Sequence, residues 1–369
     1  MKYASLSIAV AMFALAALAP GAADPRPLEI GSPAPDFALP GIDGKNYSLK
    51  DFADAKVLVI VFTCNNCPTA QAYEQRIIRL HADYKDKSVA LVAVNPNDPL
   101  AVRLDELGYT DLGDSLEDMK IRAKDRGFEF PYLYDGQTQK MSRAYGVQAT
   151  PHVFIFDQAR RLQYVGRIDD SEVKTVKSHD ARNAIEALLA GRPVPVQKTR
   201  VFGCSTKWSD KREDAKRSIE KWNAEPVALR DIDAAGAAKL AQNDSKKLRL
   251  INVWATWCGP CVVELPELVT MNRMYRGRSF EMITISMDTP DRKKRALEML
   301  TKLHVSSANW IYSGEDKDKL ADALDKQWSG ALPMTLLVAP GGKVIYRKAG
   351  QIDPLEVRRA IVECLGRTY

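Results

Sequence analysis

One arrangement of residues occurs twice in this 369-residue chain and constrains its fold more than any other feature. The apolar stretch 56–62 (KVLVIVF) leads to residues 64–67 (CNNC), and the apolar stretch 248–254 (LRLINVW) leads to residues 258–261 (CGPC). Each cysteine pair is followed by apolar residues at three- and four-residue steps, which is the spacing of an amphipathic helix. Each half therefore predicts a buried strand, a C-x-x-C pair and a helix.

The order of elements after each cysteine pair is also repeated. A second apolar strand is expected at 89–94 and at 280–287, and later a proline precedes an apolar strand at 152–156 and at 334–338. Strands that alternate with helices indicate parallel β-α-β units, here with an antiparallel hairpin at the edge. The sequence thus predicts an α/β protein with two tandem domains, each a mixed central sheet flanked by helices.

The ends of these two units are predicted from composition. Residues 1–23 combine one early lysine, an apolar run and small residues before Asp24, which is typical of a signal peptide cleaved after Ala23. We expect the domains at 24–206 and 226–369, with the charged stretch 207–225 as a linker. The chain is then exported to the periplasm or another extracytoplasmic compartment, and an uncleaved N-terminal anchor is the alternative.

The cysteine pattern favours redox-active cysteines over structural disulfides. Two close pairs and two single cysteines, Cys204 and Cys364, make a poor disulfide framework for a chain with enough apolar residues for its own cores. A zinc site needs four ligands, whereas the two pairs belong to separate domains. No metal and no cofactor are therefore expected, with a copper site at Cys64, Cys67 and His152 as the alternative.

Charge argues against a nucleic-acid partner. The net charge is +6, and the Lys and Arg residues form no cluster that could follow a phosphate backbone. The acidic run 111–118 lacks the pattern of a calcium loop, so a solvated loop and helix cap are expected there.

The second half resembles exported thioredoxin-like reductases of the TlpA/ResA type. The resemblance rests on residues 252–261 (NVWATWCGPC), with supporting matches at Glu264, Pro266 and Pro333. It implies a thioredoxin fold, a cis-proline at Pro333 that holds substrate backbone together with Leu332, and Trp257 on the rim of the site.

Thiol–disulfide exchange needs a thiolate that attacks and a second thiol that resolves the mixed disulfide. The start of a helix favours the thiolate because backbone N–H groups and the helix dipole stabilise negative charge there. We therefore assign Cys258 as nucleophile, Cys261 as resolving thiol and Glu264 as the proton shuttle. By analogy Cys64 is the nucleophile of the first pair and Cys67 its partner one turn into the helix, with these roles reversed if peroxide is the substrate.

The first half resembles the alkyl hydroperoxide reductase/thiol-specific antioxidant (redoxin) group of the same fold. Residues 31–37 (GSPAPDF) match the opening hairpin of that group, and residues 67–69 (CPT) match its reactive motif. Two departures count against a peroxidase: Cys64 replaces the active-site threonine of the group, and residues 150–152 (TPH) replace its arginine. Thr150 and a cis Pro151 are instead expected to bind substrate backbone, as in thioredoxins.

These observations lead to three functional hypotheses. The first is an exported thiol–disulfide oxidoreductase that reduces protein disulfides, receives electrons from a membrane thiol donor and can relay them between its domains. The second is a peroxidase whose first domain consumes hydroperoxide and is recycled by the tethered second domain. The third is a metal- or thiol-binding role for the first domain. Cys204 is either a third redox cysteine or a structural thiol.

Overall fold

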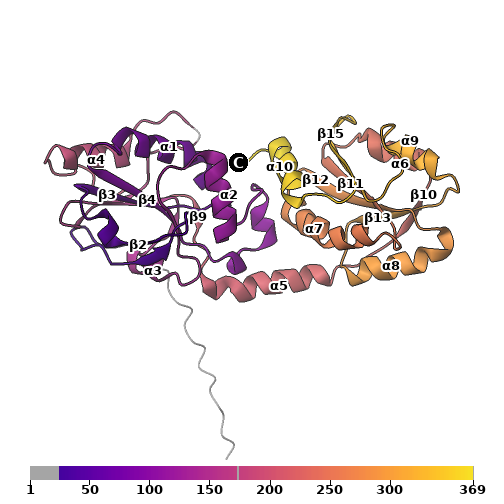
Figure 1. Ribbon diagram of the computed structural model, residues 1–369, viewed down its shortest axis with the longest axis horizontal. Coiled ribbons are helices and arrows are strands. Elements are labelled where there is room, and N and C mark those ends of the chain that lie inside the picture. Colours follow the sequence, from indigo (N-terminus) through magenta and orange to yellow (C-terminus); the bar gives the residue numbers. More distant parts are fainter. Residues whose placement is uncertain (1–24, 173, 369) are drawn as a thin grey trace, which may run out of the picture.

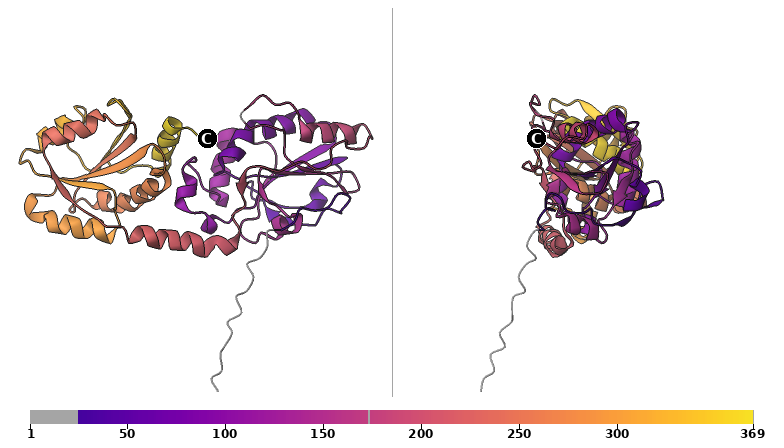
Figure 2. Two further views of the ribbon diagram at one scale, coloured as in Figure 1. Left: turned by 180° about the vertical axis from the view of Figure 1, so that it is seen from behind. Right: turned by 90° about the vertical axis from the view of Figure 1, so that its left-hand side faces the viewer.

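The computed structural model describes residues 25–172 and 174–368, and the chain forms two lobes that lie side by side along one long axis (Figure 1). The predicted signal peptide lies outside the described residues. Within the described ranges no helix is both long and apolar enough to cross a membrane. Each lobe is built around its own sheet, and helix α5 (Arg212–Asn223) runs along one side between them (Figure 2).

The sheet of the first lobe has five strands. Its order is β5 (Tyr132–Tyr134), β4 (Val89–Asn95), β3 (Val57–Phe62), β7 (His152–Phe156) and β8 (Leu162–Gly166). Strands β3, β4 and β5 are parallel, whereas β7 and β8 run antiparallel and form the predicted edge hairpin.

Strand β3 shows why the central strands are apolar throughout. Its odd-numbered residues pack into the core beneath helices α1 and α4, and its even-numbered residues pack into the core on the opposite face. Because successive side chains of a strand point to opposite faces, a strand covered on both faces reads as an unbroken apolar run. The helices of this lobe are α1 (Pro68–Tyr84), α2 (Leu116–Arg126), α3 (Lys140–Tyr145) and α4 (Asp180–Leu189).

Two short ladders and several 3₁₀ turns complete the first lobe. The ladders join β1 (Ala38–Pro40) to β2 (Asn46–Ser48), and β6 (Ala149–Thr150) to β9 (Cys204–Ser205). The 3₁₀ turns of this part of the chain are η1 (Leu49–Phe52), η2 (Pro99–Ala101), η3 (Leu104–Leu107) and η4 (Ser209–Lys211).

The second lobe repeats the plan with a six-stranded sheet. Its order is β10 (Arg230–Ile232), β13 (Ala308–Tyr312), β12 (Phe280–Ser286), β11 (Leu248–Trp254), β14 (Met334–Val338) and β15 (Val344–Ala349). The helical elements are α6 (Ala234–Gln242), α7 (Gly259–Tyr275), η5 (Pro290–Arg292), α8 (Lys293–Lys302), α9 (Lys317–Leu324) and α10 (Pro354–Leu365). As expected, β11 and β12 are parallel, and β14 and β15 close the sheet as an antiparallel pair.

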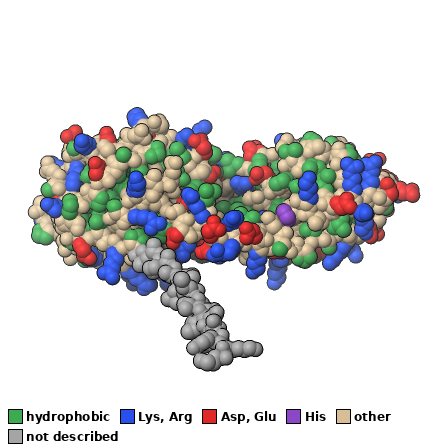
Figure 3. Space-filling model, turned by 90° about the horizontal axis from the view of Figure 1, so that it is seen from below, with side chains coloured by type: hydrophobic (Ala, Val, Ile, Leu, Met, Phe, Trp, Pro, Cys, Tyr) green, Lys and Arg blue, Asp and Glu red, His purple; other side chains and the backbone are tan. Residues whose placement is uncertain are grey.

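The lobes meet where the C-terminal end of α7 packs on the loop after η3. The Tyr275 hydroxyl donates to the Thr110 carbonyl at 2.8 Å, and the Arg278 guanidinium lies 4.0 Å from the centre of the Tyr109 ring. Buried Asp111 accepts hydrogen bonds from Arg367, near the end of the chain, at 2.5 and 3.2 Å. Seen from below, acidic and basic side chains intermix in the region between the lobes (Figure 3).

Candidate functional site

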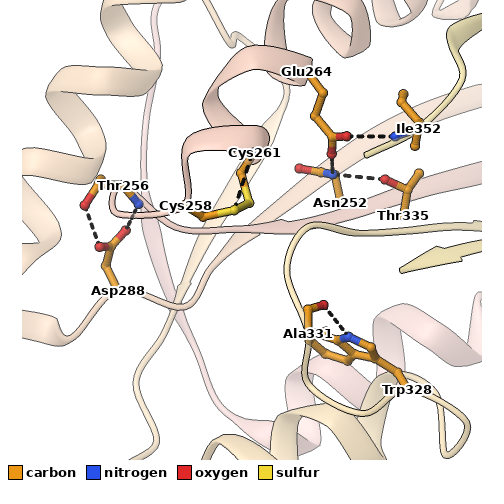
Figure 4. Close-up of a disulfide and its surroundings, with 10 residues drawn as sticks. All are labelled: Asn252, Thr256, Cys258, Cys261, Glu264, Asp288, Trp328, Ala331, Thr335 and Ile352. Atoms are coloured by element: carbon orange, nitrogen blue, oxygen red, sulfur yellow. Dashed lines mark hydrogen bonds between the residues drawn. A yellow bond between two sulfur atoms is a disulfide. The ribbon is translucent and has the colours of Figure 1, made fainter. Parts of the chain in front are cut away.

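The second lobe carries a disulfide at the start of a helix (Figure 4). Cys258 is the N-cap residue of α7 and is bonded to Cys261, one turn further on. The Cys258 sulfur also accepts a hydrogen bond from the Cys261 backbone N–H at 3.3 Å. The structure thus brings together the two cysteines that the sequence assigned to this site.

The surroundings of this disulfide present apolar surface next to a cis-proline. Trp257 and Val263 are 61% and 66% exposed, although both are large apolar residues. The Leu332-Pro333 bond is cis, as the sequence predicted, and Leu332 is half-buried against the core. The indole N–H of Trp328 donates to the Ala331 carbonyl at 2.8 Å, which fixes the loop that leads into Pro333.

Glu264 is buried one turn beyond Cys261 and lies on the same side of α7. Its carboxylate accepts hydrogen bonds from Asn252 Nδ2 at 2.9 Å and from the Ile352 backbone N–H at 3.1 Å. Burial raises the pKa of Glu264 against the lowering effect of these two donors. A raised pKa makes the carboxylate a better proton acceptor, which is the property that the predicted role requires.

Asp288 supports this site and was missed by the sequence analysis. It follows β12 and is fully buried, and its carboxylate accepts from the Thr256 backbone N–H at 2.9 Å and from the Thr256 hydroxyl at 2.7 Å. It therefore holds the loop that carries Cys258. An acidic residue directly after a predicted parallel strand was the available signal, because the carboxyl ends of such strands converge on this loop.

Three cysteines meet in the first lobe. Cys64 and Cys67 are buried and are not joined in a disulfide, and half-buried Cys204 packs against them. The Cys64 sulfur lies 3.1 Å from the Thr150 hydroxyl, and the Thr150-Pro151 bond is cis as expected. The Cys67 sulfur accepts from the backbone N–H groups of Ala70 and Cys204, both at 3.4 Å.

The two C-x-x-C pairs are offset by three residues relative to the fold. Cys67, not Cys64, is the N-cap residue of α1, just as Cys258 is the N-cap residue of α7. In each lobe, one residue of the central strand pairs with the residue two positions after the cis-proline. The N-cap cysteine lies six positions after that strand residue. Cys67 therefore corresponds to Cys258, and Cys64 corresponds to Ala255. The prediction that Cys64 starts the helix is wrong, and only the reversed assignment places a cysteine at the helix start.

The pKa values of Cys64 and Cys67 shift in opposite directions, and these shifts favour the same assignment. Burial raises the pKa of Cys64 well above its ordinary value, and neighbouring Cys67 and the Asp114 carboxylate raise it further. Burial opposes ionisation of Cys67 as well, but hydrogen bonds from the thiols of Cys204 and Cys64 and from the Ala70 N–H lower its pKa well below the ordinary value. Cys67 is thus the thiol of this pair that ionises more readily.

Asp114 lies beneath this centre and contradicts part of the sequence interpretation. The run 111–118 was expected to be solvated, but Asp111 and Asp114 are 2% and 1% exposed; only the helix cap, at Ser115, is as expected. Asp114 accepts from the Asn65 backbone N–H at 2.7 Å and from Asn97 Nδ2 at 2.8 Å. Burial raises the pKa of Asp114 to about 6.

Neither His152 nor Cys364 takes part in these centres. His152 is fully buried, its Nδ1 accepts from the Gln148 N–H at 3.4 Å, and burial lowers its pKa to about 3. The described residues contain no group of His, Cys, Asp and Glu side chains arranged to hold a metal ion, so the copper alternative gains no support. Cys364 is exposed on α10.

Comparisons with known proteins follow the same division into two halves. Residues 30–165 match the model of the AhpC/TSA family, and residues 228–361 match the Redoxin model. The chain consists of two thioredoxin-like domains. Together with the ResA relative described next, these matches confirm the predicted fold class and the resemblance of the chain to redoxins and to ResA-type proteins.

Three individual relatives share between 24% and 34% sequence identity with the chain. The thiol-disulfide oxidoreductase ResA of Oceanobacillus iheyensis is 24% identical over 143 residues, which span 38% of this chain and 64% of that protein. The thiol:disulfide interchange protein HelX of Rhodobacter capsulatus is 27% identical over 143 residues, or 36% of this chain and 74% of HelX. A solved hypothetical protein from Sinorhizobium meliloti is 34% identical and has a TM-score of 0.45, covering 49% of this chain and 96% of its own.

Proposed function

We propose that the protein is a thiol–disulfide oxidoreductase whose second domain reduces protein disulfides through Cys258 and Cys261. The observation that carries this proposal is the disulfide at the N-cap of α7 next to a cis-proline loop. Among the described strands, none pairs with residues 331–332, so the edge before Pro333 is open to a substrate backbone. The exposed Trp257 and Val263 offer apolar contact area to a protein substrate.

The reaction proceeds by two exchanges. In the reduced domain the Cys258 thiolate attacks one sulfur of the substrate disulfide, and the other sulfur leaves as a thiolate and takes up a proton. The Cys261 thiol then loses its proton to the Glu264 carboxylate and attacks the Cys258 sulfur. The second substrate sulfur leaves as a thiol, and the Cys258–Cys261 disulfide forms. Two electrons have passed to the substrate, and an external thiol donor restores the dithiol.

The proposal also covers the direction of electron transfer, the location of the protein and the source of its electrons. The CGPC motif is typical of reducing members of the fold, and the N-terminal pattern of residues 1–23 is typical of an exported chain. A reductase in an oxidising compartment needs a steady source of electrons. A membrane thiol transporter would supply them.

The first domain acts as a separate thiol centre in this account. Cys258 lies at one end of α7, and the first domain contacts the other end of that helix, about 25 Å away at 1.5 Å per residue. This separation supports separate action over direct electron relay between the two centres. A peroxidase role for the first domain remains the second candidate because the Cys67 thiolate precedes Pro68 and Thr69 at a helix start.

The test of the main proposal compares the full chain with its Cys258→Ala/Cys261→Ala variant in the dithiothreitol-driven reduction of insulin. We expect the variant to lose the acceleration over dithiothreitol alone. Cys364→Ser, which alters an exposed cysteine on α10, is the matched control and should keep it. Wild-type acceleration by the double variant would refute the proposal.

A further inference from the structure

In the first domain, strand β9 pairs with the residues that precede the cis-proline. The corresponding residues of the second domain pair with none of the described strands. Thr150 pairs with Cys204 and Ala149 with Ser205, directly before the cis Thr150-Pro151 bond. Gly203 enters this ladder with φ +143°, and a Cβ atom there would lie 2.1 Å from the Thr150 carbonyl oxygen. The approach is so close that only glycine fits. The chain's own segment therefore lies where a substrate backbone would lie.

This segment brings a cysteine to the Cys67 sulfur, as a bound substrate would. The Cys204 backbone N–H donates to Cys67 Sγ at 3.4 Å, and the Cys204 thiol interacts with the same sulfur. Both residues line an open cavity of about 270 Å³, together with Asn66, Pro68 and Tyr109. A small disulfide can therefore reach the pair from solvent.

Cys64 is less suited to exchange. It is not among the residues that line this cavity, and its thiol is engaged by the Thr150 hydroxyl at 3.1 Å and by Asn66 Oδ1 at 3.3 Å. Exchange needs a thiolate as the attacking group. The nearby Asp114 carboxylate opposes a negative charge on Cys64.

We propose that Cys204, and not Cys64, is the resolving thiol of the first domain, so that its working disulfide joins Cys67 to Cys204. This inference rests on the proposed thiol–disulfide activity of the first domain. The Cys67 thiolate attacks a disulfide, one sulfur leaves as a thiol, and a mixed disulfide remains on Cys67. The Cys204 thiol then loses its proton to solvent and its sulfur attacks Cys67 Sγ. The second sulfur leaves and takes up a proton from solvent, and the Cys67–Cys204 bond forms.

Cys64 acts as a positioning residue in this scheme. It contributes to the lowered pKa of Cys67. Loss of Cys64 should therefore shift the pH profile of the first exchange to higher pH but leave its stoichiometry unchanged.

The experiment uses the full chain with Cys258→Ala, Cys261→Ala and Cys364→Ser, which leaves only the three cysteines of the first domain. The reduced protein is mixed with oxidised glutathione, and the released glutathione is counted. We expect two molecules per chain from this background and from its Cys64→Ser derivative. The Cys204→Ser derivative should release one and retain a glutathione adduct on Cys67. Ser205→Ala, the neighbouring change in β9, is the control and should release two.

The inference is overturned if the Cys64→Ser chain stops at one glutathione or the Cys204→Ser chain proceeds to two. Peptide mapping of the oxidised background chain gives the same answer without any change to the first domain: a Cys67–Cys204 linkage is expected, and a Cys64–Cys67 linkage would refute it. If the background releases none, both this inference and the activity of the first domain fail. The insulin assay of the second domain is independent of that outcome.

Discussion

Gly203→Ala tests whether the close approach of β9 to the cis-proline loop matters for resolution at Cys67. The new Cβ would lie 2.1 Å from the backbone carbonyl oxygen of Thr150, which has no flexible side chain that could move aside. A non-glycine residue in this backbone region costs about 1–3 kcal/mol before the overlap is counted. The β6–β9 ladder has two residue pairs, and each net hydrogen bond contributes about 1 kcal/mol. The strain is thus large enough to detach the segment.

The expected consequence is kinetic. A loss of about 2 kcal/mol from the paired arrangement should slow release of the second glutathione roughly thirtyfold, since 1.36 kcal/mol corresponds to a factor of ten. Gly191→Ala is the matched control: Gly191 has φ +65°, and its added Cβ would meet nothing within 4 Å. It should cost about 1 kcal/mol of conformational strain and leave both release steps unchanged. If Gly203→Ala and Gly191→Ala release the second glutathione at equal rates, the reasoning is refuted.

Two further predictions concern buried carboxylates. Glu264→Gln should slow insulin reduction about a hundredfold, because only the ionised carboxylate accepts the Cys261 proton. The variant should also lose the rise in rate that the wild type shows as pH increases through the raised pKa of Glu264. Glu267→Gln, which alters a half-exposed ion pair with Arg358, is the control and should change neither the rate nor its pH dependence. Because the pKa of Asp114 is raised to about 6, its ionisation should lower the free energy of unfolding as pH increases from about 4 to about 6, with no further change above that range. Urea unfolding at several pH values should show this decrease in the wild type and not in Asp114→Asn, and an equal decrease in both would contradict it.

The repeated architecture could be predicted because it depends on local patterns. Strands β3 and β11 are buried on both faces and therefore read as unbroken apolar runs. The cis bonds at Pro151 and Pro333 followed from resemblance and are confirmed. The domain boundaries and the catalytic roles of the cysteines stay predictions.

What the sequence could not give depends on contacts between distant residues. The spacing C-x-x-C is identical in both halves, so it does not reveal that Cys67 caps its helix while Cys64 precedes it. The pairing of Cys204 with Thr150 joins residues far apart in sequence through a two-residue strand, which is too short for a periodic signal. Burial of Asp111 and Asp114 is likewise decided by partners elsewhere, among them Arg367 and Asn97.

The central claim is that a cysteine at the start of a helix is the attacking thiol of the second domain. Its most direct test mixes the reduced Cys261→Ala chain with insulin and analyses the products by non-reducing electrophoresis and peptide mapping. The account predicts a stable mixed disulfide between insulin and Cys258, and no such complex at Cys261 in the Cys258→Ala chain. A complex joined through Cys261, or none through Cys258, would contradict it.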